Sequence, residues 1–94
     1  MATEVVQDVS MSRFELLVDG VQAGISDYVQ DDEKIVFLHT EIDPAFRGQG
    51  LGDEIARGAL NLVRAESSRR VVARCPFIKK WISEHADYQD LLTR

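Results

Sequence analysis

Cysteine, proline and long apolar runs are all scarce in this sequence. Its 94 residues include one cysteine and two prolines. A single cysteine excludes an internal disulfide framework and a cysteine-rich zinc module, and no other metal-ligand spacing stands out. No apolar run approaches the roughly 20 residues of a membrane helix, and the polar, acidic residues 2–12 do not resemble a signal peptide. We therefore expect a reduced, cytoplasmic protein with no membrane span and no metal.

Positive charge is also scarce, because the formal net charge is −5. This balance argues against nucleic acid as a partner. The charge is unevenly distributed, however, since residues 44–82 carry eight basic and three acidic side chains. A basic half of this kind can hold one small polyanion. The other half would favour a cationic partner, through the acids Asp27, Asp31, Asp32, Glu33, Glu41 and Asp43.

Hydrophobic residues make up 45% of the chain, which is typical of a folded globular protein. We expect one domain over residues 1–94, with residues 1–12 as a flexible or edge segment. Alternating apolar residues predict a strand from Phe14, and Asp19-Gly20 predicts a tight hairpin turn after it. The second strand would cover residues 21–29, with Val21, Ala23 and Ile25 on one face. The third and most apolar strand would cover residues 35–42.

Helical spacing begins after this third strand. Asp43-Pro44 ends the strand, and four apolar residues then lie on one helix face: Leu51, Ile55, Ala59 and Leu62. Gly58 in this helix predicts close packing against the sheet. A fourth strand is expected over residues 70–75, followed by a last helix with the apolar stripe Ile78, Trp81, Ile82, His85 and Tyr88. The predicted fold is α/β, with the order strand-strand-strand-helix-strand-helix, a mixed sheet and a parallel pair formed by the third and fourth strands.

The most informative segment is the turn Arg47-Gly48-Gln49-Gly50-Leu51-Gly52, which joins a buried strand to a helix. Glycines let backbone N–H groups approach a ligand closely, and a helix N-terminus attracts phosphate. The spacing is G-x-G-x-G, which differs from the dinucleotide fingerprint and lacks the Gly-Lys-Ser/Thr ending of a nucleotide-triphosphate loop. Two interpretations remain at this point: a phosphate-binding turn, or a helix entry that binds nothing.

The pattern Arg47-x-x-Gly50-x-Gly52 resembles the Arg/Gln-x-x-Gly-x-Gly/Ala signature of the GNAT acetyltransferases. The resemblance continues through the lead-in Ile42-Asp43-Pro44-Ala45-Phe46 and through Cys75-Pro76-Phe77 to Trp81. It covers nearly all of residues 14–92 and is most similar to the small, single-domain GNAT-like subfamily. It implies a minimal GNAT fold and an acetyl-CoA co-substrate. The pyrophosphate would bind at Arg47, Gly48, Gln49, Gly50, Leu51, Gly52 and Asp53, and the pantetheine would lie along Ile42, where the third and fourth strands splay.

The resemblance also implies transfer of an acetyl group from the thioester to an amine, which needs a base and an acid. His39 and Glu41 are candidate bases and are expected on the same strand face as Phe37. The alternative is that His39 is a packing residue and Glu41 a solvated strand residue. Cys75 is a candidate proton donor or acyl-carrying nucleophile, or else a buried thiol. His85 is expected to be a hydrogen-bonded core histidine.

The sequence departs from the larger family at two points. Many members have a tyrosine acid where this chain has Trp81, whose indole cannot act as an acid; Tyr88 could substitute, although core packing is the alternative. Larger relatives also have N-terminal helices that enclose the acceptor, so here the acceptor site would be open or completed by a partner subunit. The acceptor would then be an exposed amine such as a protein side chain, with the chain a monomer or dimer. Two further hypotheses are a non-catalytic CoA-binding sensor or adaptor and a structural domain.

Overall fold

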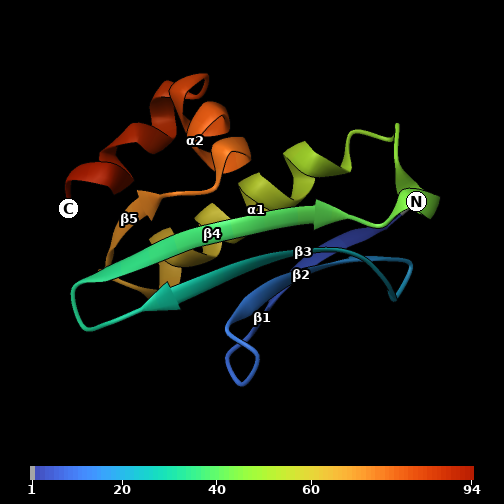
Figure 1. Cartoon of the computed structure of the whole chain (residues 1–94), viewed down its shortest axis with the longest axis horizontal. Helices are drawn as coiled ribbons and strands as arrows, with labels where there is room; N and C mark the ends of the chain where they lie inside the picture. The colour runs from blue at the N-terminus through green and yellow to red at the C-terminus, as the bar shows by residue number, and fades with distance from the viewer. Residues whose placement is uncertain (1) are drawn as a thin grey trace.

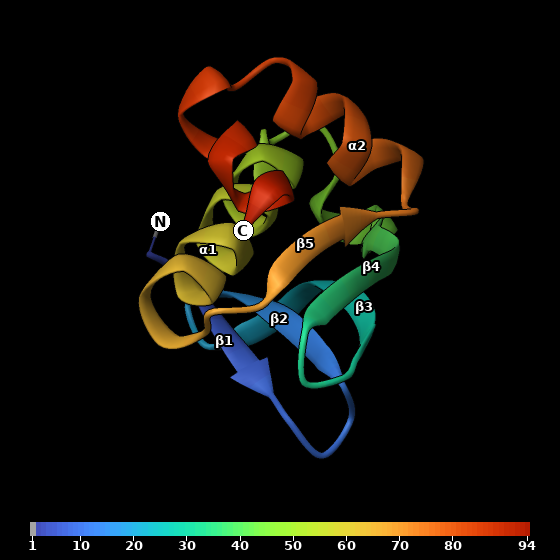
Figure 2. The same cartoon turned by 90° about the vertical axis from the view of Figure 1, so that its left-hand side faces the viewer.

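A computed structural model describes residues 2–94 and places one sheet beneath a layer of helices. The sheet contains β1 (Thr3–Asp8), β2 (Arg13–Val18), β3 (Val21–Gln30), β4 (Lys34–Ile42) and β5 (Arg70–Ala73). The helical layer contains α1 (Leu51–Glu66), α2 (Pro76–Ser83) and the 3-10 segment η2 (Ala86–Thr93), while a single 3-10 turn, η1 (Pro44–Phe46), follows β4. Figure 1 and Figure 2 show the helical layer on one face of the sheet.

The strands follow chain order, β1-β2-β3-β4-β5. The first four are antiparallel, and β5 pairs with β4 in parallel through α1, so the predicted α/β mixed sheet is confirmed. The structure adds β1, an edge strand, in the segment expected to be flexible or at an edge; Met1 of that segment lies outside the described residues. The order of the remaining elements agrees with the prediction.

The β2–β3 hairpin turns where the sequence predicted it. Asp19 and Gly20 both have positive φ, 50° and 83°, as a tight two-residue turn that matches the strand twist requires. The predicted face of β3 is wrong, because a bulge interrupts the register there. Leu16 lies opposite Gly24 and Leu17 opposite Gln22, which leaves Ala23 without a partner. Ala23 is buried, whereas Ile25 lies on the opposite face.

The core lies between the sheet and the helices. α1 buries six residues toward the sheet: Leu51, Ile55, Ala56, Ala59, Leu60 and Val63. Gly58 of this helix faces Val5 of β1 so closely that a Cβ at position 58 would clash with the valine, which confirms the predicted close packing. α2 ends at Ser83, earlier than expected, and Tyr88 lies in η2.

Candidate acyl-transfer site

β4 and β5 separate halfway along β4. Their parallel pairing ends at Phe37 and Ala73, two residues before the predicted end of the fourth strand. The carbonyl of Phe37 accepts hydrogen bonds from the N–H groups of both Arg74 and Cys75, at 3.0 and 2.9 Å. The chain then turns into α2 at Pro76, whereas β4 continues to Ile42. Among residues 2–94, no backbone hydrogen bond joins residues 38–42 to the segment after Cys75, so this edge of β4 is free.

A bulge in β4 coincides with the point of separation. Asp27 pairs with His39 and Tyr28 with Phe37, so Leu38 has no partner on β3. The extra residue reverses the direction of every later side chain. Phe37 is fully buried, whereas His39 and Glu41 are exposed on the face that carries no helix. The prediction that these three share one face is therefore wrong, because strand alternation does not reveal a bulge.

The bulge also directs Thr40 toward the core side of the sheet, where its hydroxyl lies between two others. Thr40 Oγ1 is 2.9 Å from the Oγ of Ser26, and it accepts a hydrogen bond from Cys75 Sγ at 3.5 Å. Ser26 is fully buried and Cys75 is 3% exposed. The thiol therefore lies at the β4–β5 separation, held by a hydroxyl of the neighbouring strand. Thr40 and Ser26 were not predicted as site residues, because each lies beside other polar or charged residues in its strand.

The glycine-rich turn connects the free end of β4 to α1. Gly48 and Gly50 have φ of 83° and 74°, and Gly50 is the N-cap of α1. A Cβ at either position would meet no atom within 4 Å, so the left-handed backbone, and not crowding, favours glycine there. Arg47 is exposed beside these two glycines. No side chain caps this helix N-terminus with a hydrogen bond, which suits an anionic group.

The other residues of the turn differ in which of their atoms a ligand could reach. Leu51 is buried, so only its backbone could meet a ligand. Gly52 lies beneath the ring of Phe77, since a Cβ there would be 2.9 Å from Phe77 Cζ. Phe77, 41% exposed, therefore stands between the start of α1 and the start of α2. In the sequence, Phe77 is notable only as part of the segment that resembles the family.

The carboxylate of Asp53 is engaged by groups of the helical layer. Trp81 donates its indole N–H to Asp53 Oδ1 at 2.9 Å, Arg57 lies 3.5 Å from the same oxygen, and His85 Nε2 lies 3.8 Å from it. The His85 ring stacks on Trp81 with centroids 3.7 Å apart, and its Nδ1 is 2.6 Å from the Trp81 carbonyl oxygen. His85 is hydrogen-bonded and mostly buried, as expected.

Tyr88 does not lie in a position to replace the missing tyrosine acid. Its hydroxyl donates to Asn61 Oδ1 at 2.8 Å, on the side of α1 away from the β4–β5 separation. Its ring packs edge-on against Trp81, with centroids 4.9 Å apart. The packing alternative for Tyr88 therefore agrees with the structure.

His39 and Glu41 form a pair on the uncovered face. His39 Nε2 lies 3.6 Å from Glu41 Oε2, and both side chains are 62% exposed. The pair is open to solvent and to any ligand on this face. The structure thus brings His39 and Glu41 together, and it places Cys75 on the other side of the same strand.

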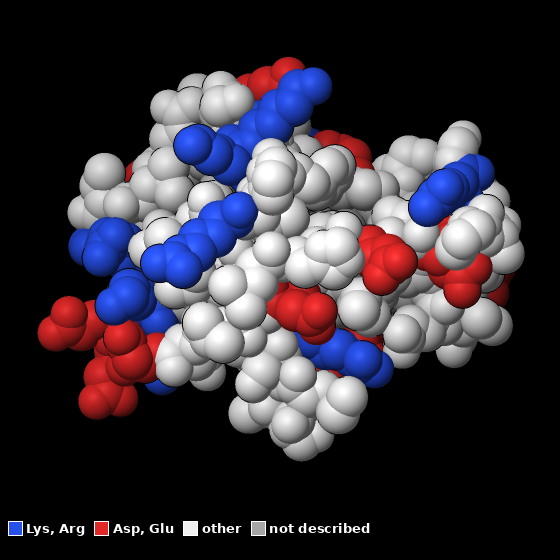
Figure 3. Space-filling model, in the orientation of Figure 1, with Lys and Arg blue, Asp and Glu red and all other residues white. Residues whose placement is uncertain are grey.

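Charge is divided between two parts of the surface. The segment from β5 into α2 carries Arg70, Arg74, Lys79 and Lys80, and Figure 3 shows basic side chains gathered on that side. Acidic side chains lie across the middle of the same view, and a further acidic cluster lies at its lower left, next to basic side chains. Within residues 2–94, no three His, Cys, Asp or Glu side chains are placed to hold a metal ion. None of the helices described is both long and apolar enough to cross a bilayer.

Comparison with known protein families identifies the arrangement. The model of the GCN5-related N-acetyltransferases, a family that generally uses acetyl-CoA as the co-substrate of acyl transfer, matches residues 13–91. No curated protein matches the chain at a significant level. The matched range includes the four strands from β2 to β5, the glycine-rich turn and both α-helices. The chain therefore belongs to the GCN5-related N-acetyltransferase family.

Proposed function

We propose that this protein binds acetyl-CoA where β4 and β5 separate and transfers the acetyl group to an exposed amine. The observation that carries the proposal is the free edge of β4 beyond Phe37, which leads directly to the glycine-rich turn. An extended ligand can pair with a free strand edge while its anionic end meets the helix N-terminus.

Each predicted donor-site residue has a distinct role in this proposal. The backbone of Ile42 would meet the pantetheine arm, and Arg47 would supply positive charge. The amides of Gly48, Gln49, Gly50, Leu51, Gly52 and Asp53 would meet the pyrophosphate. Asp53 would contribute its backbone only, because its carboxylate already accepts the Trp81 indole N–H. The Arg57 guanidinium, 3.5 Å from that carboxylate, would offset its repulsion of the phosphates.

Bound acetyl-CoA supplies a thioester, so the protein's own residues must position the amine and move two protons. His39 lies two residues beyond Phe37 and is the nearer base candidate, with the Glu41 carboxylate 3.6 Å from its Nε2. Cys75 is the acid candidate, because its thiol already carries a directed proton toward Thr40 at the strand separation. A nucleophilic role for Cys75 would instead need the thiol to lose this proton before the acetyl group arrives.

Binding is tested by titration calorimetry with acetyl-CoA on Gly50→Ala and Gly20→Ala. Both glycines have positive φ and open surroundings, so each variant carries a similar backbone strain of about 1–2 kcal/mol. Only Gly50 lies in the turn, and we expect an affinity loss of about ten-fold for Gly50→Ala alone. Equal affinity in both variants, or no binding to the unaltered chain at millimolar ligand, would overturn the proposal.

The second candidate function is a CoA-binding sensor or adaptor that does not transfer the acyl group. The observation in its favour is Trp81, which occupies the expected position of the tyrosine acid and uses its only donor on Asp53. Turnover of an amine panel by the unaltered chain, Cys75→Ala and His39→Gln separates the two functions. If Cys75→Ala and His39→Gln both lower the rate of acetyl transfer and leave the affinity for acetyl-CoA unchanged, the protein is an enzyme. Intact binding with no acetylated amine supports the adaptor.

A further inference from the structure

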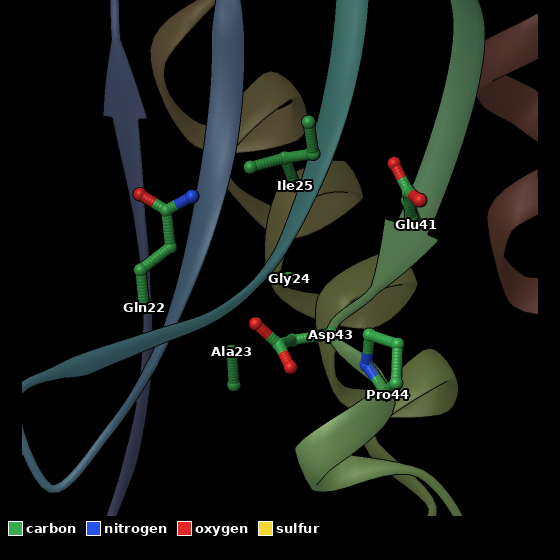
Figure 4. A pocket seen from close by; sticks show the side chains of 7 residues that line it. All are labelled: Gln22, Ala23, Gly24, Ile25, Glu41, Asp43 and Pro44. Carbon is green, nitrogen blue, oxygen red and sulfur yellow. The ribbon is translucent and has the colours of Figure 1, made fainter.

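The uncovered face of the sheet contains a hollow that the proposed donor site does not use. Its volume is about 250 Å³, and it opens where β3 and β4 meet η1. Figure 4 shows its lining residues, with the Asp43 carboxylate at its foot beside Pro44 and the side chains of Ile25 and Glu41 standing on neighbouring strands. The remaining lining comes from Gln22, Ala23 and Gly24.

The hollow is built by the fold and does not depend on a mobile loop. The N–H of Asp43 donates to the carbonyl of Ala23 at 2.8 Å, which ties the end of β4 to the β3 bulge. Gly24 lies so close to β4 that a Cβ there would be 2.7 Å from Ile42 Cδ1. Asp43 also accepts a hydrogen bond from the N–H of Ala45 at 2.9 Å, which fixes its carboxylate at the hollow.

The chemistry of the lining suits a cation on an aliphatic stem. Glu41 and Asp43 have no lysine or arginine within 4.0 Å among the described residues, and the partner recorded for Glu41 is His39. Ile25 and Pro44 supply apolar surface beside the two carboxylates. A lysine or arginine side chain can place its methylenes against such a surface and its charge near the carboxylates. The hollow is open to solvent, in contrast to the enclosed pockets of small-molecule sites.

The foot of the hollow lies too far along the chain to hold the reacting amine of the proposed function. The proposed base is His39, and Asp43 at the foot of the hollow is four residues further along, about 13 Å at the usual rise of an extended chain. An extended peptide bound along this face would span the same distance in about four residues. Two side chains four residues apart also point to the same face of an extended chain.

We propose that this hollow is an acceptor subsite for a second cationic side chain, four residues from the lysine that is acetylated, on an extended peptide. This inference rests on the proposed function, because the position of the reacting amine comes from the proposed donor site. The substrate class is therefore a peptide segment with two spaced basic residues, and an isolated small amine would use only part of the site.

The test follows backbone amide NMR shifts of the full chain, saturated with CoA, during titration with two peptides. One carries a central lysine with arginines four residues to either side, and the other has glutamine at both flanking positions. We expect the basic peptide to shift the amides of Gly24, Ile25 and Glu41 and to bind about five-fold more tightly. Asp43→Asn, which keeps the acceptor for the Ala45 N–H, should remove that difference, whereas Asp32→Asn at the far end of β4 should preserve it.

The outcomes distinguish the two proposals. Equal affinity for both peptides, or shifts that miss the hollow, would overturn the subsite even if CoA shifts the amides of residues 48–52. Absence of shifts at residues 48–52 with CoA would instead overturn the proposed donor site. If Asp32→Asn abolishes the preference for the basic peptide as fully as Asp43→Asn does, the preference is a general charge effect. That result would also overturn the subsite.

Discussion

Residues 35–37 of β4 are paired with strands on both edges, whereas residues 39–42 of the same strand are paired on one edge only. The first half contributes the buried side chains of Ile35, Val36 and Phe37. The second half exposes His39 and Glu41 on one face and directs Thr40 to a buried cysteine on the other. Edge pairing and burial in the first half serve stability, and the free edge of the second half is available to a ligand.

One inserted residue accounts for much of this difference. Leu38 is 40% exposed and has no partner on β3, while its neighbour Phe37 is fully buried. A bulge re-aims side chains and terminates pairing at modest cost to the rest of a sheet. The strand can therefore belong to the core at one end and to a candidate site at the other.

The largest expected effect is that of Phe37→Ala, which removes a buried ring from the first half of β4. Phe37 is fully buried and stacks on Phe14, with ring centroids 5.8 Å apart. We expect the free energy of unfolding to fall by about 3–5 kcal/mol in urea denaturation, because a cavity remains in the core. Leu38→Ala is the matched control one residue away and should cost less than about 1 kcal/mol. Similar losses in the two variants would contradict the division of β4.

Thr40→Val should have an intermediate effect on the free energy of unfolding. It alters the second half of β4 on the side that faces the core. The substitution keeps the shape of the side chain but leaves Ser26 and Cys75 without their shared hydroxyl partner. We expect a loss of about 1–3 kcal/mol in the free energy of unfolding, since Ser26 is fully buried. Adding Ser26→Ala should recover part of the loss, and a double-mutant cycle with purely additive effects would show that the two hydroxyls do not interact.

The smallest expected effect is that of Asp31→Asn, in the turn that leads into the first half of β4. Two backbone N–H groups, of Glu33 and Lys34, and the Lys34 ammonium lower the pKa of Asp31 from 3.8 to about 2. A pKa that is depressed by folding stabilises the folded state above pH 3.8, and this contribution is lost as the pH falls toward 2.

We therefore expect the melting temperature of Asp31→Asn to lie slightly below that of the unaltered chain at pH 6. The difference should shrink between pH 4 and pH 2 as the carboxylate becomes protonated. Asp32→Asn, one residue away and exposed, is the control and should show a smaller pH-dependent difference. A gap between Asp31→Asn and the unaltered chain that is independent of pH would mean that the carboxylate charge does not contribute.

The sequence by itself determined the order of elements from β2 to α2, the hairpin at Asp19-Gly20, and the glycine-rich turn. These features depend on local physics: side-chain period, residues that tolerate positive φ, and the inability of proline to continue a strand. The turn signature also led to the family that the comparison of residues 13–91 then identified.

Only the tertiary structure decided which face each strand residue occupies and how far β5 follows β4. Both bulges, at Ala23 and at Leu38, depend on register between strands, which the period of one strand does not encode. The meeting of Thr40, Ser26 and Cys75 joins three separate strands or strand ends, and Trp81 reaches Asp53 across two helices. These contacts form only when elements distant in sequence pack together, so the glycine-rich turn could be predicted from the sequence and the residues packed around it could not.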